Sequence, residues 1–166
     1  SLLVGETSEP LMSIGVKKQK IYWDTTKINK TLNDHPDLDI DVIKSVPYLL
    51  ENPVLIMQSK NPGYRQGNNR ISLYGDLYNR NGIPVVAILE LEPNAKNVVL
   101  DEIKIASTHA RADINNPKSM KPTSEFIKNH TIKYVDPDKK RTAGWLARTG
   151  LQLPFLPADS GSIGTI

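Results

Sequence analysis

The amino-acid sequence predicts an α+β domain, with helices first and an antiparallel sheet of four to five strands after them. Three observations lead to this class. Apolar residues recur at helical spacing before Asn52, whereas after it they alternate or form short blocks, as in strands. An Asn-Gly pair at Asn81 indicates a tight hairpin between two of these strands. Helices and strands that occupy separate parts of a chain are typical of α+β folds.

One domain is expected, because 166 residues suit a single hydrophobic core. We expect it to cover residues 19–154, between a flexible lead-in at 1–18 and a flexible tail at 155–166. The lead-in lacks the basic start and long apolar centre of a signal peptide. No apolar run approaches the roughly 18 residues of a membrane span, so no membrane partner is expected.

The first predicted helix covers Thr25–Asn33. Asp24 or the Thr after it offers an N-cap, and Ile28 and Leu32 lie on one face of the helix. The helix should end before Pro36, because the residue that precedes a proline is driven out of the helical region. The apolar segment just before this helix, residues 21–23, is either a short strand or a staple against the helix.

The second predicted helix begins after Asp39, with Ile40, Ile43 and Val46 as its buried stripe. Pro47 is expected to end this helix and start a new turn, since proline suits a first helical turn and breaks an interior. The Asn-Pro pair at 52–53 closes that turn.

The remaining elements are predicted from alternation and from turn residues. Strands are expected at 54–59, 70–78, 84–91, 99–106 and 131–135, with a short helix at 123–129. A last helix, 138–149, should place Trp145 and Leu146 inward and end at Gly150. These elements complete an α+β domain with a C-terminal helix.

Basic residues are concentrated in the second half of the chain. Residues 104–148 carry ten Lys and Arg against four Asp and Glu, whereas residues 1–103 carry eleven against thirteen. Such asymmetry fits a nucleic-acid surface, where Lys and Arg neutralise phosphates. A solvated outer face is the other interpretation.

The segment with the most chemistry is Ile103–Ala106 and the residues after it. The segment alternates as a half-buried strand does, and it is followed by Ser107, Thr108, His109 and Arg111. A hydroxyl, a titratable ring and a fixed cation at a strand end suit the binding or attack of a phosphodiester. In extended backbone Ser107, His109 and Arg111 share one face, about 6.6 Å apart. The other interpretation is a strand that runs into a polar loop.

No metal or cofactor is expected. The chain has no Cys, which excludes disulfides and thiolate metal sites. Its three histidines, at 35, 109 and 130, are far apart and do not have the HExxH spacing of a zinc site.

Several phrases, in their order along the chain, carry a family resemblance. They are N-D-H-P at 33–36, V-P-Y-L-L-E-N-P-V at 46–54, N-G-I-P-V-V-A at 81–87, I-A-S-T-H at 105–109, K-Y-V-D at 133–136, K-R-T-A-G-W-L at 140–146 and G-L-Q-L-P at 150–154. Over roughly residues 19–154 the sequence resembles the phage-borne C-terminal domains of MuF-type head morphogenesis and polyvalent proteins. That family is placed in the barnase–EndoU–colicin–RelE (BECR) group of ribonucleases.

The resemblance implies two N-terminal helices on a four-stranded antiparallel sheet, with RNA cleaved on the sheet face. It implies a catalytic role for His35, at the family's His-Pro position, and a phosphate-binding role for Ser107. The sequence departs from the family at His109, where an aromatic or small residue would be more usual after the Ser.

Chemistry gives the candidate residues their roles. RNA cleavage without a metal needs a base for the 2′-OH, an acid for the 5′-oxygen and cations for the transition state. His35 and His109 are the candidate base and acid, because imidazole titrates near neutrality. Arg111 is the candidate fixed cation, because guanidinium binds phosphate at two points. His130 is more simply a cation at a helix C-terminus.

The candidate RNA-binding residues each have a structural alternative. Ser59 could lie beside Ser107 or cap a turn, and Tyr134 could stack on a base or pack in the core. The basic residues of the last helix could contact phosphate or form its solvated face; they are Lys139, Lys140 and Arg141.

The predicted function is a metal-independent endoribonuclease toxin domain of phage or mobile-element origin, without cofactor. Its partners would be RNA and an immunity protein, and it would act in the cytoplasm of a target cell, delivered within a larger protein. One alternative is a non-catalytic phage head-associated domain that binds protein or nucleic acid. Another is an ADP-ribosyltransferase toxin, for which Glu90 or Glu92 would supply the catalytic carboxylate.

Overall fold

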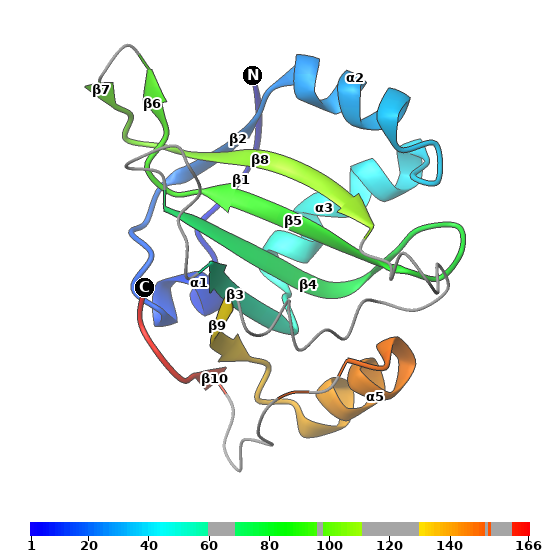
Figure 1. Cartoon of the computed structure of the whole chain (residues 1–166). Helices are drawn as coiled ribbons and strands as arrows, with labels where there is room; N and C mark the ends of the chain where they lie inside the picture. Colours follow the sequence, from blue (N-terminus) through cyan, green and yellow to red (C-terminus); the bar gives the residue numbers. More distant parts are fainter. Residues whose placement is uncertain (60–68, 96–97, 111–129, 152, 154–160) are drawn as a thin grey trace.

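The structure, a computed structural model, describes residues 1–59, 69–95, 98–110, 130–151, 153 and 161–166 (Figure 1). It is an α+β fold, as predicted. Eight described strands form one large mixed sheet in the order β1-β2-β8-β5-β4-β3-β9-β10, and β6 and β7 form a separate two-stranded ribbon. The described part of the chain has four helices.

The strands of the large sheet are β1 (Leu2–Glu6), β2 (Lys20–Trp23), β3 (Leu55–Ser59), β4 (Arg70–Tyr78), β5 (Pro84–Glu90), β8 (Ile103–Ala110), β9 (His130–Val135) and β10 (Gly161–Ser162). The ribbon consists of β6 (Asn94–Ala95) and β7 (Val98–Val99). The helices are α1 (Glu9–Ser13), α2 (Thr25–Asp34), α3 (Ile40–Glu51) and α5 (Lys139–Thr149).

The expected sheet of four to five antiparallel strands is wrong in the number of strands and in one pairing. The centre, β8-β5-β4-β3-β9, is antiparallel, but β2 runs parallel to β8, with Ile21 opposite Ile103 and Tyr22 opposite Lys104. Local periodicity cannot reveal a pairing between segments about 80 residues apart. It predicted β2 as a possible short strand but not its neighbour.

Residues 1–18 and 161–166, which belong to the two ends expected to be flexible, are part of the fold. Residues 1–18 form β1 and α1, and Leu11, Ile14 and Val16 are buried. After the undescribed residues 154–160, β10 pairs with β9, and the backbone N–H of Ile166 donates to the carbonyl of Ile14 at 2.9 Å. Elements this short contain too few residues to show a helical or strand-like spacing of apolar residues, so the sequence did not indicate them.

Side chains of the sheet alternate between two buried faces. On one face, which we call the helix face, residues such as Leu73 and Leu89 pack with Val46 and Leu49 of α3. On the other face, which we call the α5 face, residues such as Tyr74 and Val86 cluster with Trp145 of α5. Figure 1 shows α3 crossing behind the central strands and α5 near β9. The sheet is therefore covered in part on both sides.

The caps of the first two long helices are those predicted. Asp24 accepts from the backbone N–H of Thr26 at 2.9 Å, and Asp39 accepts from that of Val42 at 3.1 Å. The predicted break at Pro47 is wrong, because α3 runs through it to Glu51. Burial of the apolar stripe on both sides of the proline, about 1.5–3 kcal/mol per side chain, exceeds the roughly 3 kcal/mol that an interior proline costs.

Strand β8 differs from its prediction in both boundaries. It begins at Ile103 and not near Val99, and it continues past Ala106 to Ala110. Ser107 and His109 therefore belong to the strand and not to a polar loop. The loop predicted at 111–122 and the helix at 123–129 lie outside the described residues.

Candidate functional site

Two imidazoles from distant parts of the chain lie together at one edge of the fold. His35 is the C-cap of α2, and His109 is in β8. Their ring centroids are 5.9 Å apart and the ring planes are inclined by 25°, a stacked arrangement. Both residues are half-buried, so each ring keeps some access to solvent. The structure thus brings the two candidate acid–base residues together; their catalytic role stays a prediction.

A β-bulge aims His109 at its face of the sheet. Ile103 and Ile105 point to the helix face, but the register between β5 and β8 shifts at this point, with Leu89 opposite Ile105 and Ile88 opposite Ser107. Beyond the shift, Ser107 and His109 share the α5 face with Ile88 and with Val86, the partner of His109. Bulges commonly re-aim a side chain in this way beside functional sites.

The loop after α2 holds His35. The backbone N–H of His35 donates to Thr31 at 2.9 Å, and its carbonyl accepts from the N–H of Leu38 at 2.9 Å. Asp37 then joins this loop to the β4–β5 hairpin, because its carboxylate accepts from the Asn79 amide at 2.8 Å. Since β5 also pairs with β8, one framework positions both imidazoles.

Asn79 organises the hairpin as well as the contact to the loop. Its side-chain oxygen accepts from the backbone N–H groups of Asn81 and Ile83, both at 2.9 Å. Gly82 has φ of +77°, a left-handed conformation that glycine adopts without strain. The tight turn predicted from Asn81-Gly82 is confirmed, and its first residue ties the turn to the candidate site.

A row of charged residues on the α5 face was missed by the sequence analysis. Glu90 lies opposite Lys104 on one side and opposite Arg70 on the other. Glu90 is 8% exposed, and its carboxylate is 3.4 Å from the Arg70 guanidinium. Counting outward from the hairpin turn would have indicated that strand ends near 70 and 90 meet. This pairing also occupies Glu90, one of the two candidate carboxylates of the ADP-ribosyltransferase alternative.

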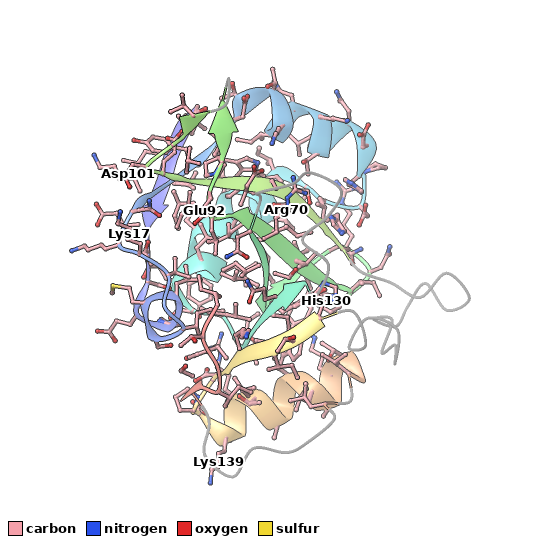
Figure 2. All side chains as sticks on the ribbon, turned by 60° about the vertical axis from the view of Figure 1, so that its left-hand side comes forward. Lys17, Arg70, Glu92, Asp101, His130 and Lys139 are labelled. Carbon is pink, nitrogen blue, oxygen red and sulfur yellow. The ribbon has the colours of Figure 1, made fainter. Side chains whose placement is uncertain are left out.

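His130 is the first residue of β9, opposite Ser59 in β3. The helix whose C-terminus it was expected to occupy lies outside the described residues. Of the two interpretations of Ser59, a place beside Ser107 is wrong, because β4 and β5 separate β3 from β8. Figure 2 labels His130 on β9 and Arg70 on β4. Arg111 also lies outside the part of the chain that the structure describes.

Tyr134 does not present its ring for base stacking. It is 7% exposed, lies opposite Ile56, and packs in the core of the helix face. Burial raises the pKa of its hydroxyl above the ordinary value of 10.0. The RNA-binding role predicted for Tyr134 is therefore wrong, and its structural alternative holds.

Arg141 is an internal clamp and not an outward-facing cation. Its Nη1 donates to Asp136 at 2.5 Å, its Nη2 to the carbonyl of Asn52 at 2.6 Å and its Nε to Asp76 at 2.8 Å. Burial opposes its charge, yet the hydrogen bonds that it donates to Asp136 and Asp76 prevail and raise the pKa of Arg141. The expectation that Arg141 faces solvent with Lys139 is corrected.

The two lysines beside Arg141 match the prediction of an exposed face. Lys139 and Lys140 are both exposed, and Figure 2 shows Lys139 extending away from the sheet. Among the described residues, no group of three His, Asp or Glu could hold a metal ion. No helix in the described ranges is long and apolar enough to cross a membrane.

Comparison with known proteins places this α+β chain among phage-associated domains. The family model described as the phage MuF C-terminal domain matches residues 27–142, from within α2 to within α5. The matched range includes both His35 and His109, and it covers more than half of the chain. The chain therefore belongs to the phage MuF C-terminal domain family. Neither a search of curated proteins nor a search of solved structures found a match.

Proposed function

We propose that this phage MuF C-terminal domain is a metal-independent endoribonuclease that acts as a toxin on RNA in a target bacterial cell. The observation that carries the proposal is the stacked pair of His35 and His109, with ring centroids 5.9 Å apart. Two imidazoles this close can reach one phosphodiester, and imidazole is the side chain that most often serves as a general acid or base.

The proposed reaction uses one imidazole as base and the other as acid. The base removes the proton of the 2′-OH, whose oxygen then bonds to phosphorus while the bond from phosphorus to the 5′-oxygen breaks. The acid protonates the leaving 5′-oxygen. The products are a 2′,3′-cyclic phosphate and a 5′-hydroxyl, so neither water nor a redox partner is consumed.

Ser107 and a cation would stabilise the charge that develops on phosphate. Ser107 precedes His109 by two residues on the same face, about 6.6 Å away in extended backbone. Its hydroxyl can donate to a non-bridging oxygen, and donors aimed at developing charge are among the largest catalytic contributions. Arg111 remains the predicted cation of the reaction.

The test is cleavage of a labelled RNA oligonucleotide by the purified domain, with and without EDTA. We expect a cyclic phosphate product, no effect of EDTA, and a loss of about 10²-fold or more in His35→Ala and in His109→Ala, the size typical of losing a general acid or base. His130→Ala is the matched control and should retain nearly full activity. Full activity in both site variants, or activity abolished by EDTA, would contradict the proposal.

A non-catalytic phage-associated domain is the second candidate, favoured by the family match, which concerns phage association alone. It predicts RNA or protein binding with no cleavage in any variant. The oligonucleotide assay separates the two candidates, because the second gives intact RNA with the wild-type protein.

A further inference from the structure

A cleft of about 480 Å³ lies between α5 and the end of β4, apart from the imidazole pair. Tyr78 forms one wall, and Lys140, Gly144 and Arg148 form the other. These three α5 residues are spaced i, i+4 and i+8, so they lie along one side of the helix. Eight residues of helix separate the two cations by about 12 Å.

Gly144 makes room between the two cations. A Cβ atom built at this position would have no neighbour within 4 Å, and the residue is exposed. Because glycine weakens a helix interior by roughly 1 kcal/mol relative to alanine, helix formation does not favour it here. What glycine supplies at this position is open space between Lys140 and Arg148.

Arg148 is held in place by an aromatic ring. Its guanidinium carbon is 3.5 Å from the centroid of the Tyr78 ring, a cation–π contact. Such stacking uses the face of the guanidinium and leaves its N–H groups, which lie in its plane, for oxygen acceptors. Within the described residues, Arg148 and Lys140 form no salt bridge, whereas Arg141 at the base of the cleft is neutralised by Asp76 and Asp136.

The cleft lies at the same end of the sheet as His109. Tyr78 is opposite Pro84 in β5, and Val86, two residues on, is opposite His109 in β8. Two strand spacings and a two-residue rise place Tyr78 and His109 roughly 12 Å apart along the sheet. Both Tyr78 and Val86 pack on the α5 face.

We propose that this cleft is a subsite for a backbone phosphate of single-stranded RNA, close along the strand to the bond that the imidazole pair would cleave. The inference rests on the proposed function. Lys140 and Arg148 bind the phosphate oxygens, and the gap at Gly144 admits the ribose–phosphate chain. Asp76 and Asp138 also line the cleft, but Asp76 is paired with Arg141 and Asp138 caps α5 through the backbone N–H of Arg141. Lys140 and Arg148 are therefore the charges of the cleft with no carboxylate partner among the described residues, and they favour an anion.

The test measures binding of a fluorescent 2′-O-methyl RNA oligonucleotide by anisotropy. This RNA lacks the free 2′-OH, so binding is measured whether or not the domain cleaves RNA. Gly144→Leu fills the gap and adds a better helix former, and it should weaken binding about tenfold. Arg148→Gln should weaken binding by about three- to tenfold. Ala143→Leu, an equally large side chain outside the cleft, should bind within twofold of wild type.

Three results would overturn the subsite: no binding by the wild type, unchanged binding by Gly144→Leu, or an equal loss in Ala143→Leu. Displacement of the RNA by polyglutamate as readily as by unlabelled RNA would assign the cleft to an acidic protein instead. Absence of cleavage by the wild type refutes the proposed function and is read in the separate cleavage assay. The two failures are therefore distinguishable.

Discussion

Arg141→Gln tests the clamp that fastens α5 to the rest of the fold, and it should lower the free energy of unfolding by about 3 kcal/mol. A hydrogen bond to a charged group contributes about 1.5–3 kcal/mol. The bonds to Asp136 and to the Asn52 carbonyl supply most of the loss, because the Asp136 side chain is only 13% exposed. The share of Asp76 is small, since its side chain is 41% exposed and screened by solvent.

Urea unfolding followed by tryptophan fluorescence is the assay, because Trp145 of α5 is buried against the sheet. A loss of about 3 kcal/mol corresponds to a fall in Tm of roughly 6–12 °C for a domain of this size. Lys140→Gln changes the exposed neighbour and should stay within about 0.5 kcal/mol of wild type. An Arg141→Gln protein as stable as Lys140→Gln would refute the reasoning and return Arg141 to the candidate RNA contacts.

Three further predictions concern the site and its frame. The double variant His35→Ala with His109→Ala should lose less cleavage rate than the product of the two single-variant losses, because the effects of residues that act as a unit are not additive. If single-turnover assays show a loss equal to that product, the two residues have independent roles. Asp37→Ala removes the hydrogen bond from Asn79 and should lower the free energy of unfolding by about 1 kcal/mol. It should also lower cleavage about tenfold, because the loop that holds His35 loses its contact to the hairpin. Cleavage equal to that of the wild type would show that the loop does not position His35. Thr108→Val removes a buried hydroxyl that has no hydrogen-bond partner among the described residues. The variant should therefore have a free energy of unfolding about 1 kcal/mol higher than the wild type, with no loss of cleavage. A lower free energy of unfolding in urea would contradict this.

The helices were predictable because their signals are local. Asp24 and Asp39 as N-caps, and Gly150 with φ of +71° as the C-cap of α5, act within one turn of the residues they stabilise. The edge of the sheet was not predictable, because the pairing of Ile21 with Ile103 depends on segments far apart in the chain. Local sequence determines which segments are strands far better than it determines their neighbours.

The same distinction explains which site residues were assigned correctly to a surface. The sequence shows that Arg141 is a cation, but not that it is neutralised by Asp76, 65 residues away. It shows that Tyr134 is an aromatic residue, but not that Tyr134 lies opposite Ile56. Exposure was predicted correctly for Lys139, which has no such distant partner among the residues that the structure describes.

The bulge in β8 connects the fold to the candidate site. Strict alternation from Ile103 would place His109 on the helix face with Ile105, the face that carries the larger buried apolar cluster. The register shift near Ala106 moves His109 to the opposite face and turns Thr108 inward, where the residue is 1% exposed and its hydroxyl has no hydrogen-bond partner in the described part of the chain. An unsatisfied buried hydroxyl costs about 1–3 kcal/mol, so packing alone does not favour this register. The register shift is explained if function requires His109 to lie beside His35, which is where the shift places it.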